Sequence, residues 1–138
     1  MIKIGLIGSI GSGKSFVAKQ FGFPVFNADN EISKIYKKDK NCFKKLKKII
    51  PKYVKSFPIK KSELTKAILE NNKNLKKITK IVHPLIKNKM KIFLKKNRRK
   101  KIVILDIPLL MENKINNKNF YLIFVDAKKK EILKRLNK

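Results

Sequence analysis

The sequence predicts an α/β fold built on a parallel sheet, because short β-rich runs alternate with helical runs and a glycine-rich turn joins the first β-rich run to a helix. The chain has 138 residues, 43% of them hydrophobic and 33% charged, which suits a single globular domain over residues 1–138. Its longest apolar stretch, residues 102–111, contains Asp106 and is about half the ~20 residues that a membrane-spanning helix needs. We therefore expect no membrane-spanning segment.

Four short runs rich in β-branched and aromatic residues predict the strands. Three of these runs finish beside an aspartate, which would put Asp29, Asp106 and Asp126 at the carboxyl ends of their strands. The predicted strands cover residues 2–7, 24–28, 102–105 and 121–125, and helices are predicted over residues 15–21 and 128–137.

A long helical insertion over residues 30–99 separates the second and third predicted strands, which leaves 1–29 and 100–138 as the core. Within it, Ser62 is predicted to cap the start of a helix, and Pro84 is predicted to end one helix and begin the next. The insertion is too long for a connecting loop and combines apolar helical faces with many lysines. We expect it to bind a ligand that has both an apolar arm and negative charge.

The chain is strongly basic, with 37 Lys and Arg residues against 9 Asp and Glu residues and a formal net charge of +28. Only three of the basic residues are arginines, although proteins that read nucleic acids use arginine heavily. Solvated lysine faces, with codon drift in an AT-rich genome, therefore explain the charge better than nucleic-acid binding does. The one cysteine, Cys42, excludes an internal disulfide and favours the reducing cytoplasm.

The strongest chemical signal is the segment 8–15, GSIGSGKS, which matches the phosphate-binding pattern G-x-x-x-x-G-K-[ST]. It lies directly after a predicted strand and directly before a predicted helix, the context in which backbone N–H groups can surround a phosphate. Lys14 would reach the β- and γ-phosphates of a nucleotide, and the Ser15 hydroxyl would bind Mg²⁺. The sequence therefore predicts a nucleotide site with Mg²⁺, and the pattern alone leaves the reaction open.

The type of reaction depends on residues outside this loop. A GTPase would need the base-reading pattern N-K-x-D, and the nearest candidate, residues 117–120, lacks the aspartate. A kinase of small molecules needs an acid that accepts the proton of the attacking hydroxyl. Asp29, Asp106 and Asp126 would lie on the same side of the sheet as the loop, although each could instead cap a turn.

Several segments, in this order, resemble dephospho-CoA kinase: residues 4–15, then PVFNAD, HPLI, DIPLLME and VDA, beginning at positions 24, 83, 106 and 125. The resemblance covers essentially the whole chain. It implies a P-loop NTPase three-layer fold like that of nucleoside monophosphate kinases, with a helical CoA-binding insertion and a mobile lid. It also implies transfer of the γ-phosphate of ATP to the ribose 3′-hydroxyl of dephospho-CoA, the last step of coenzyme A synthesis.

The resemblance also assigns roles to single residues. Asp29 falls on the family's catalytic aspartate, and Arg135 matches an arginine at the start of the lid. Asp106, which the resemblance does not assign, is a weaker candidate that would help to order Mg²⁺ through water. Two positions depart from the family, since Phe16 stands where threonine is usual and Asn27 where the first aspartate of D-x-D is usual. The predicted ATP-binding residues are Gly8, Gly11, Ser12, Gly13, Lys14, Ser15 and Phe16, and the predicted acceptor-binding residues are Asp29, His83, Pro84, Leu109, Leu110 and Glu112.

In the family, the helix after the VDA segment leads to the lid and a closing segment, whereas this sequence stops at Lys138. We therefore expect either a fragment of a longer reading frame or a truncated enzyme of reduced activity. Two alternatives stay open at this stage. One is another small-molecule P-loop kinase, such as a nucleoside monophosphate kinase, and the other is a basic nucleic-acid-binding protein with a vestigial P-loop.

Overall fold

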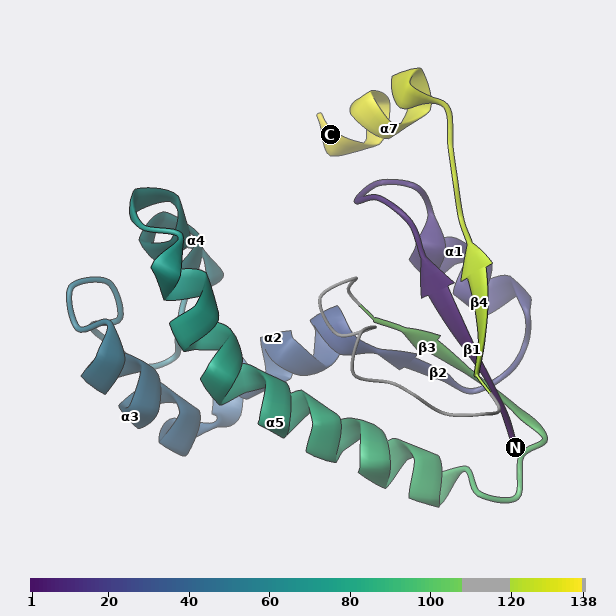
Figure 1. Cartoon of the computed structure of the whole chain (residues 1–138), viewed down its shortest axis with the longest axis horizontal. Helices are drawn as coiled ribbons and strands as arrows, with labels where there is room; N and C mark the ends of the chain where they lie inside the picture. The colour runs from purple at the N-terminus through teal and green to yellow at the C-terminus, as the bar shows by residue number, and fades with distance from the viewer. Residues whose placement is uncertain (108–119, 138) are drawn as a thin grey trace. The chain divides into compact units, whose positions relative to one another are not determined.

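The computed structural model describes residues 1–107 and 120–137. The chain divides into two compact units, one formed by residues 1–28 together with 90–138 and the other by residues 29–89. The first unit contains the sheet, and the second contains most of the helical insertion (Figure 1).

The first unit is built on a parallel sheet of four described strands, as the sequence predicts. The strands lie in the order β2-β3-β1-β4, so that β1 and β3 occupy the centre. Because all the pairings are parallel, the carboxyl ends of the strands meet at one edge of the sheet. The strands are β1 (Ile2–Ile7), β2 (Val25–Asn27), β3 (Ile102–Asp106) and β4 (Phe120–Phe124).

Helix α1 (Lys14–Gln20) packs on this sheet and closes a small apolar core. Leu6 of β1 and Ile104 of β3 are fully buried there, and Ala18 is the buried residue of α1. Phe26 of β2 also contacts Phe93, with ring centroids 5.5 Å apart. Helix α7 (Lys129–Leu136) follows β4. These contacts fix the glycine-rich turn between two well-packed elements.

Four helices span the insertion, and in the described part of the second unit their buried side chains are mostly apolar. Asp39 caps α3 by accepting a hydrogen bond from the backbone N–H of Cys42 at 2.8 Å. The helices are α2 (Ala28–Lys38), α3 (Lys40–Ile49), α4 (Lys61–Glu70) and α5 (Lys73–Lys96). The buried apolar residues include Ile35, Leu46, Val54, Leu64, Ile78, Val82 and Ile86.

Three sequence-based boundaries in this region are wrong. Pro84 does not separate two helices but lies inside the 24-residue helix α5. Ser62 lies within α4, whose N-cap is Lys60, and the Glu63 carboxylate accepts a hydrogen bond from the Lys60 backbone N–H at 3.3 Å. Asp29 does not end a strand, because β2 stops at Asn27 and Asp29 is the second residue of α2.

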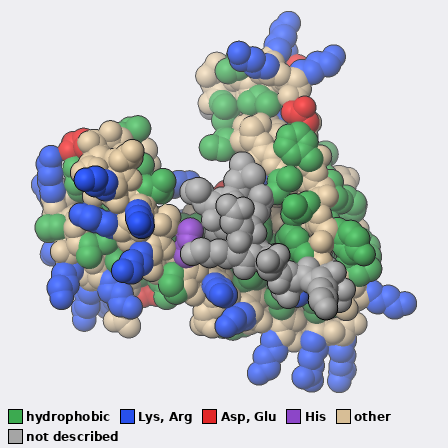
Figure 2. Space-filling model, in the orientation of Figure 1, with side chains coloured by type: hydrophobic (Ala, Val, Ile, Leu, Met, Phe, Trp, Pro, Cys, Tyr) green, Lys and Arg blue, Asp and Glu red, His purple; other side chains and the backbone are tan. Residues whose placement is uncertain are grey.

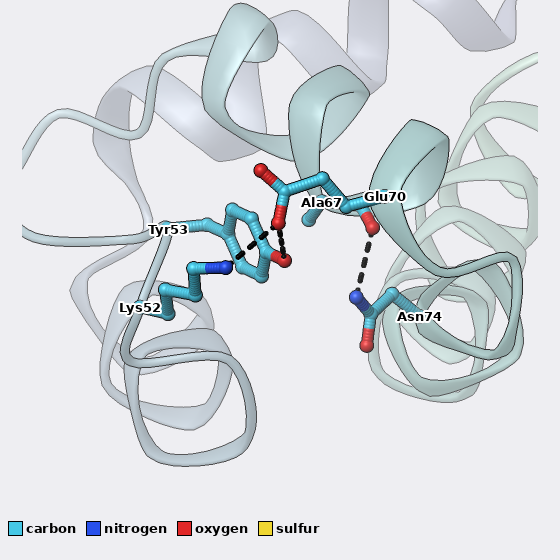
Figure 3. A network of polar contacts seen from close by, with 5 residues as sticks. All are labelled: Lys52, Tyr53, Ala67, Glu70 and Asn74. Carbon is cyan, nitrogen blue, oxygen red and sulfur yellow. Dashed lines mark hydrogen bonds and ion pairs between the residues drawn. The ribbon is translucent and has the colours of Figure 1, made fainter.

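A polar network connects α4 with the segments on either side of it (Figure 3). Lys52 and Tyr53 both donate to Glu70 Oε2, at 2.8 and 2.5 Å, and these hydrogen bonds lower the pKa of the Glu70 carboxyl. The buried Asn74 side chain of α5 donates to the Ala67 carbonyl at 2.8 Å. The short connections around α4 are therefore held by side-chain hydrogen bonds as well as by apolar packing.

Lysine and arginine side chains lie in several places on the visible surface of both units in Figure 2, between hydrophobic and other side chains. Acidic side chains on the same face are few, as the composition requires. In the part of the chain that the structure describes, no helix has the length and hydropathy needed to cross a bilayer.

Candidate nucleotide site

The glycine-rich turn lies between β1 and α1, at the edge of the sheet where the parallel strands end. Gly8, Gly11 and Gly13 have φ values of +150°, +81° and +99°, which side-chain-bearing residues rarely adopt. A Cβ atom on Gly8 would lie 2.2 Å from the Val125 carbonyl oxygen. The backbone therefore needs glycine here for both its conformation and its close approach to the chain after β4.

Two cationic side chains contact the turn. Lys14 Nζ donates to the carbonyl oxygens of Gly8 and Ser9 at 2.8 and 3.0 Å, so its ammonium group lies over the turn. Arg135 of α7 donates from Nη1 to the Gly11 carbonyl at 2.9 Å. The structure thus brings together a glycine turn, a lysine and an arginine, the groups that stabilise a transferring phosphoryl group.

A hydroxyl and a carboxylate meet beside the turn. Ser15 Oγ donates to Asp106 Oδ2 at 2.8 Å, and Asn27 Nδ2 donates to the same oxygen at 2.8 Å and to Ser15 Oγ at 3.3 Å. Asp106 is the last residue of β3 and only 7% exposed, so these two donors offset the loss of hydration of its charge. Ser15 and Asp106, the two residues expected to bind Mg²⁺ directly or through water, therefore lie in direct contact.

These oxygen atoms fit a magnesium ion. Mg²⁺ prefers oxygen ligands, keeps several waters, and is usually held by one or two protein groups together with substrate phosphates. Among the described residues there is no cluster of three His, Cys, Asp or Glu side chains that could hold a metal without a nucleotide. Ser15 and Asp106 supply two side-chain oxygens of the preferred kind, and water and phosphate oxygens would complete the coordination.

The Ser12 hydroxyl differs from the other polar groups of the turn. Ser12 is 4% exposed, and its Oγ atom has no hydrogen-bond partner in the described structure. This oxygen lies 2.9 Å from the position that a Cβ atom on Gly8 would occupy. A phosphate oxygen in the turn could accept a hydrogen bond from it.

The remaining residues that the sequence predicts for the site are mostly exposed in the part of the chain that the structure describes. Phe16 belongs to α1 and is 69% exposed, whereas Asp126 is exposed and accepts a hydrogen bond from the Ala127 N–H at 2.8 Å. Asp29 is an exposed residue of the second unit, and so is Pro84, next to the half-buried His83. Three predicted acceptor-binding residues lie outside the described residues: Leu109, Leu110 and Glu112.

The second unit has a cavity of its own, about 630 Å³ in volume, between α3 and α5. Its lining combines four apolar side chains with three lysines, so it offers an apolar wall and positive charge together. The lining residues are Lys45, Ile49, Lys77, Lys80, Ile81, Pro84 and Leu85.

Comparison with known proteins identifies the relatives of the chain. The family model for dephospho-CoA kinase matches residues 2–138. The dephospho-CoA kinase of Wolbachia sp. subsp. Brugia malayi is 36% identical over 129 residues, which cover 90% of this chain and 66% of that protein. The enzyme of the same name from Wolbachia pipientis wMel is 34% identical, over 97% of this chain and 71% of the relative. The chain thus spans about two thirds of the length of these curated relatives.

Solved structures share the fold of the chain. TT1252 from Thermus thermophilus superposes with a TM-score of 0.75 at 28% identity, over 98% of this chain and 70% of that one. The dephospho-CoA kinase from Campylobacter jejuni superposes with a TM-score of 0.66 at 24% identity, over 88% of this chain and 64% of that one. The fold is that of the P-loop NTPases, and by the match to the family model and to relatives more than 30% identical, the chain belongs to the dephospho-CoA kinase family.

Proposed function

We propose that the protein transfers the γ-phosphate of ATP to the ribose 3′-hydroxyl of dephospho-CoA and so completes coenzyme A synthesis. The observation that carries the kinase chemistry is the glycine turn with Lys14 over it and the Ser15–Asp106 pair beside it. In the reaction, the 3′-oxygen forms a bond to the γ-phosphorus while the bond from that phosphorus to the β,γ-bridging oxygen breaks. ADP leaves, and the hydroxyl proton goes to a base.

The turn is suited to bind the phosphates and neutralise their charge. Its positive-φ glycines allow backbone N–H groups to point toward a phosphate, and the unpaired Ser12 hydroxyl can add a donor. Lys14 and Arg135 now donate to carbonyl oxygens of the turn, and phosphate oxygens are stronger acceptors for both side chains. Ser15 would hold Mg²⁺ directly and Asp106 would hold it through water, and the bound ion would neutralise negative charge on the phosphates.

Asp29 is our candidate for the base that accepts the 3′-hydroxyl proton. It follows Asn27 by two residues, so the chain ties it to the carboxyl end of β2, and its side chain is exposed to a ligand. A carboxylate in contact with the attacking hydroxyl would orient it as well as take its proton. Arg135 would stabilise the charge of the transferring group from the α7 side.

The insertion is our candidate for the acceptor site. Dephospho-CoA has a long, weakly polar arm attached to a diphosphate, and the cavity between α3 and α5 combines apolar side chains with three lysines. Pro84 lines this cavity, and His83 precedes it. Leu109, Leu110 and Glu112 remain predicted acceptor contacts. We assign the reaction to the cytoplasm, in keeping with a buried and unpaired Cys42.

The test is an assay with γ-labelled ATP against a panel of acceptors that includes dephospho-CoA and adenosine monophosphate. Lys14→Ala should lower transfer to dephospho-CoA by about 10²–10³-fold, as expected for loss of a group that stabilises transition-state charge. Asp29→Asn keeps the shape but removes the proton acceptor, so kcat should fall while ATP affinity changes little. Lys19→Ala is the matched control, because Lys19 lies at the other end of α1.

Each alternative assignment predicts a different result in this assay. Faster transfer to adenosine monophosphate than to dephospho-CoA would assign the protein to a different small-molecule kinase. Transfer by Lys14→Ala at the parent rate would exclude the turn as the phosphate site. Unchanged turnover in Asp29→Asn would remove only Asp29 from the mechanism.

A further inference from the structure

The Asn27 side chain contacts both protein groups that suit the metal, Ser15 and Asp106. It ends β2, and the parallel register places it opposite Asp106, the last residue of β3. From there its Nδ2 atom reaches Asp106 Oδ2 at 2.8 Å and Ser15 Oγ at 3.3 Å. The three side chains come from β2, β3 and α1 and form a closed triangle, because Ser15 Oγ also donates to Asp106 Oδ2 at 2.8 Å.

We infer that Asn27 is a positioning residue for the divalent cation of the nucleotide complex, holding the Asp106 carboxylate and the Ser15 hydroxyl at the carboxyl edge of the sheet. This inference rests on the proposed nucleotide site and extends it to a residue that the phosphate-binding pattern does not contain. An outer partner that fixes the orientation of metal-binding groups commonly affects metal affinity by about 10–100-fold.

The chemistry of the amide matters as much as its position. Asn27 is half-buried, Asp106 is 7% exposed, and the contact between them joins a neutral donor to a charged acceptor. An aspartate at position 27 would instead bring a second carboxylate to within hydrogen-bond distance of the first, which is unfavourable unless a cation lies between or beside them. Asn27 therefore orients the metal-binding groups of Asp106 and Ser15 before a cation binds, and it adds no charge of its own.

The experiment measures how strongly Mg²⁺ and ADP assist each other's binding. ADP is titrated by calorimetry, first with excess Mg²⁺ and then with EDTA. The dissociation constant in EDTA divided by the dissociation constant with Mg²⁺ gives the coupling ratio between metal and nucleotide. Asn27→Ala should lower this ratio by about tenfold, because Asp106 and Ser15 lose their common donor. Asn27→Asp should change it in the opposite direction, mainly by weakening ADP binding in EDTA, where two carboxylates would face the phosphates.

The matched control is Asn97→Ala. The Asn97 side chain donates a hydrogen bond of comparable length to the Phe93 carbonyl, at 2.9 Å, in the same unit and just after the end of α5. Its removal should leave the coupling ratio unchanged, even if it lowers stability. Circular dichroism of each variant confirms folding, and the near-isosteric Asn27→Asp supplies the answer if Asn27→Ala unfolds.

The outcomes separate this role from the proposed function. If the parent protein binds no ADP in the presence of Mg²⁺, the nucleotide site and the role of Asn27 are both overturned. If the parent binds Mg·ADP and both Asn27 variants show the parent coupling ratio, only the role of Asn27 is overturned.

Discussion

At the scale of single residues, Gly8 is a position that cannot accommodate a side chain. Its φ of +150° and the 2.2 Å approach of a Cβ atom to the Val125 carbonyl leave no room for a side chain. We expect Gly8→Ala to lower the free energy of unfolding by more than the ~1–3 kcal/mol of backbone strain alone. We also expect it to weaken ADP binding, because the turn must move.

Gly22→Ala is the control for this prediction. Gly22 also has a positive φ, +68°, but a Cβ atom there would meet nothing within 4 Å. Its substitution should cost about 1–2 kcal/mol and leave ADP affinity unchanged. Urea unfolding and ADP titration of the two variants measure both quantities. Parent-like ADP affinity in Gly8→Ala would contradict the description of the turn.

The buried thiol of Cys42 should make the stability of the fold depend on pH. Burial, and then the nearby Asp39 charge, raise the pKa of the Cys42 thiol to about 11, and burial raises the pKa of Tyr36 to about 12. Between about pH 9 and pH 11 the folded state therefore holds a proton on Cys42 that the unfolded chain has lost. The stabilisation is complete below pH 9 and disappears as the pH rises through 11.

Urea unfolding at pH 8, 9.5 and 11 tests this expectation. The free energy of unfolding should fall with pH in the parent and fall less steeply in Cys42→Ala, which cannot titrate at that position. Asn41→Ala, at an exposed neighbouring position of α3, serves as the control and should keep the parent slope. Identical slopes in the parent and in Cys42→Ala would show that the Cys42 pKa is not raised.

The residues of the candidate site differ in how readily the sequence predicts them. Ser15 belongs to a contiguous pattern, and the contact it makes with Asp106 follows from the rule that parallel strands end at one edge. The contribution of Asn27 depends on the register between β2 and β3, which pairs it with Asp106. No local pattern in one sequence determines that register, so from sequence Asn27 is visible only as a departure from the family.

At the scale of elements, the strands are predicted well because each is a short apolar run bounded by glycine, proline or charge. The boundaries of the helices in the insertion are harder to predict from sequence, because local rules for capping and for proline compete with packing. Pro84 illustrates this competition: buried residues on both sides of it, Ile78, Val82 and Ile86, keep one helical period. Burial of that face outweighs the helix-breaking tendency of proline, so the helix continues.

Because helix α5 continues through Pro84, this proline lowers the free energy of unfolding. An interior proline removes one backbone hydrogen bond and crowds the carbonyl four residues earlier, at a cost of about 3 kcal/mol. Since Pro84 is exposed, Pro84→Ala should create no buried void and should raise the free energy of unfolding by up to about 3 kcal/mol. Urea unfolding of the full chain measures the change.

Pro51→Ala is the matched control, because Pro51 is exposed and lies in the turn after α3, where no helical hydrogen bond is missing. Its substitution should change stability little or lower it slightly, as the unfolded chain gains freedom. A loss of stability in Pro84→Ala would mean that the packing of α5 requires the shape that proline imposes.

At the scale of the whole molecule, the net charge of +28 attracts ATP, dephospho-CoA and other anions alike. Long-range attraction of this kind is screened over about 8 Å at physiological salt and does not distinguish one nucleotide from another. Selectivity among acceptors must come from local shape and apolar contact. In the second unit, the cavity between α3 and α5 offers both, together with its lysines.

Dephospho-CoA should slow hydrogen exchange of backbone amides in α3 and α5, because its arm would cover Ile49, Ile81 and Leu85. Adenosine monophosphate carries the charge but has no such arm, so at equal occupancy and ionic strength it should leave these amides unprotected. Hydrogen exchange followed by mass spectrometry of the full chain measures both ligands.

Two lysine variants separate the cavity from the general charge of the surface. Lys80 lines the cavity, whereas Lys73 begins α5 outside it, and both are exposed. Lys80→Glu and Lys73→Glu change the net charge equally, so any effect of long-range attraction is the same in both. Only Lys80→Glu should reduce the protection given by dephospho-CoA, because it places a negative charge beside the diphosphate. Equal reduction in the two variants, or equal protection by adenosine monophosphate, would mean that charge alone brings the acceptor to the insertion.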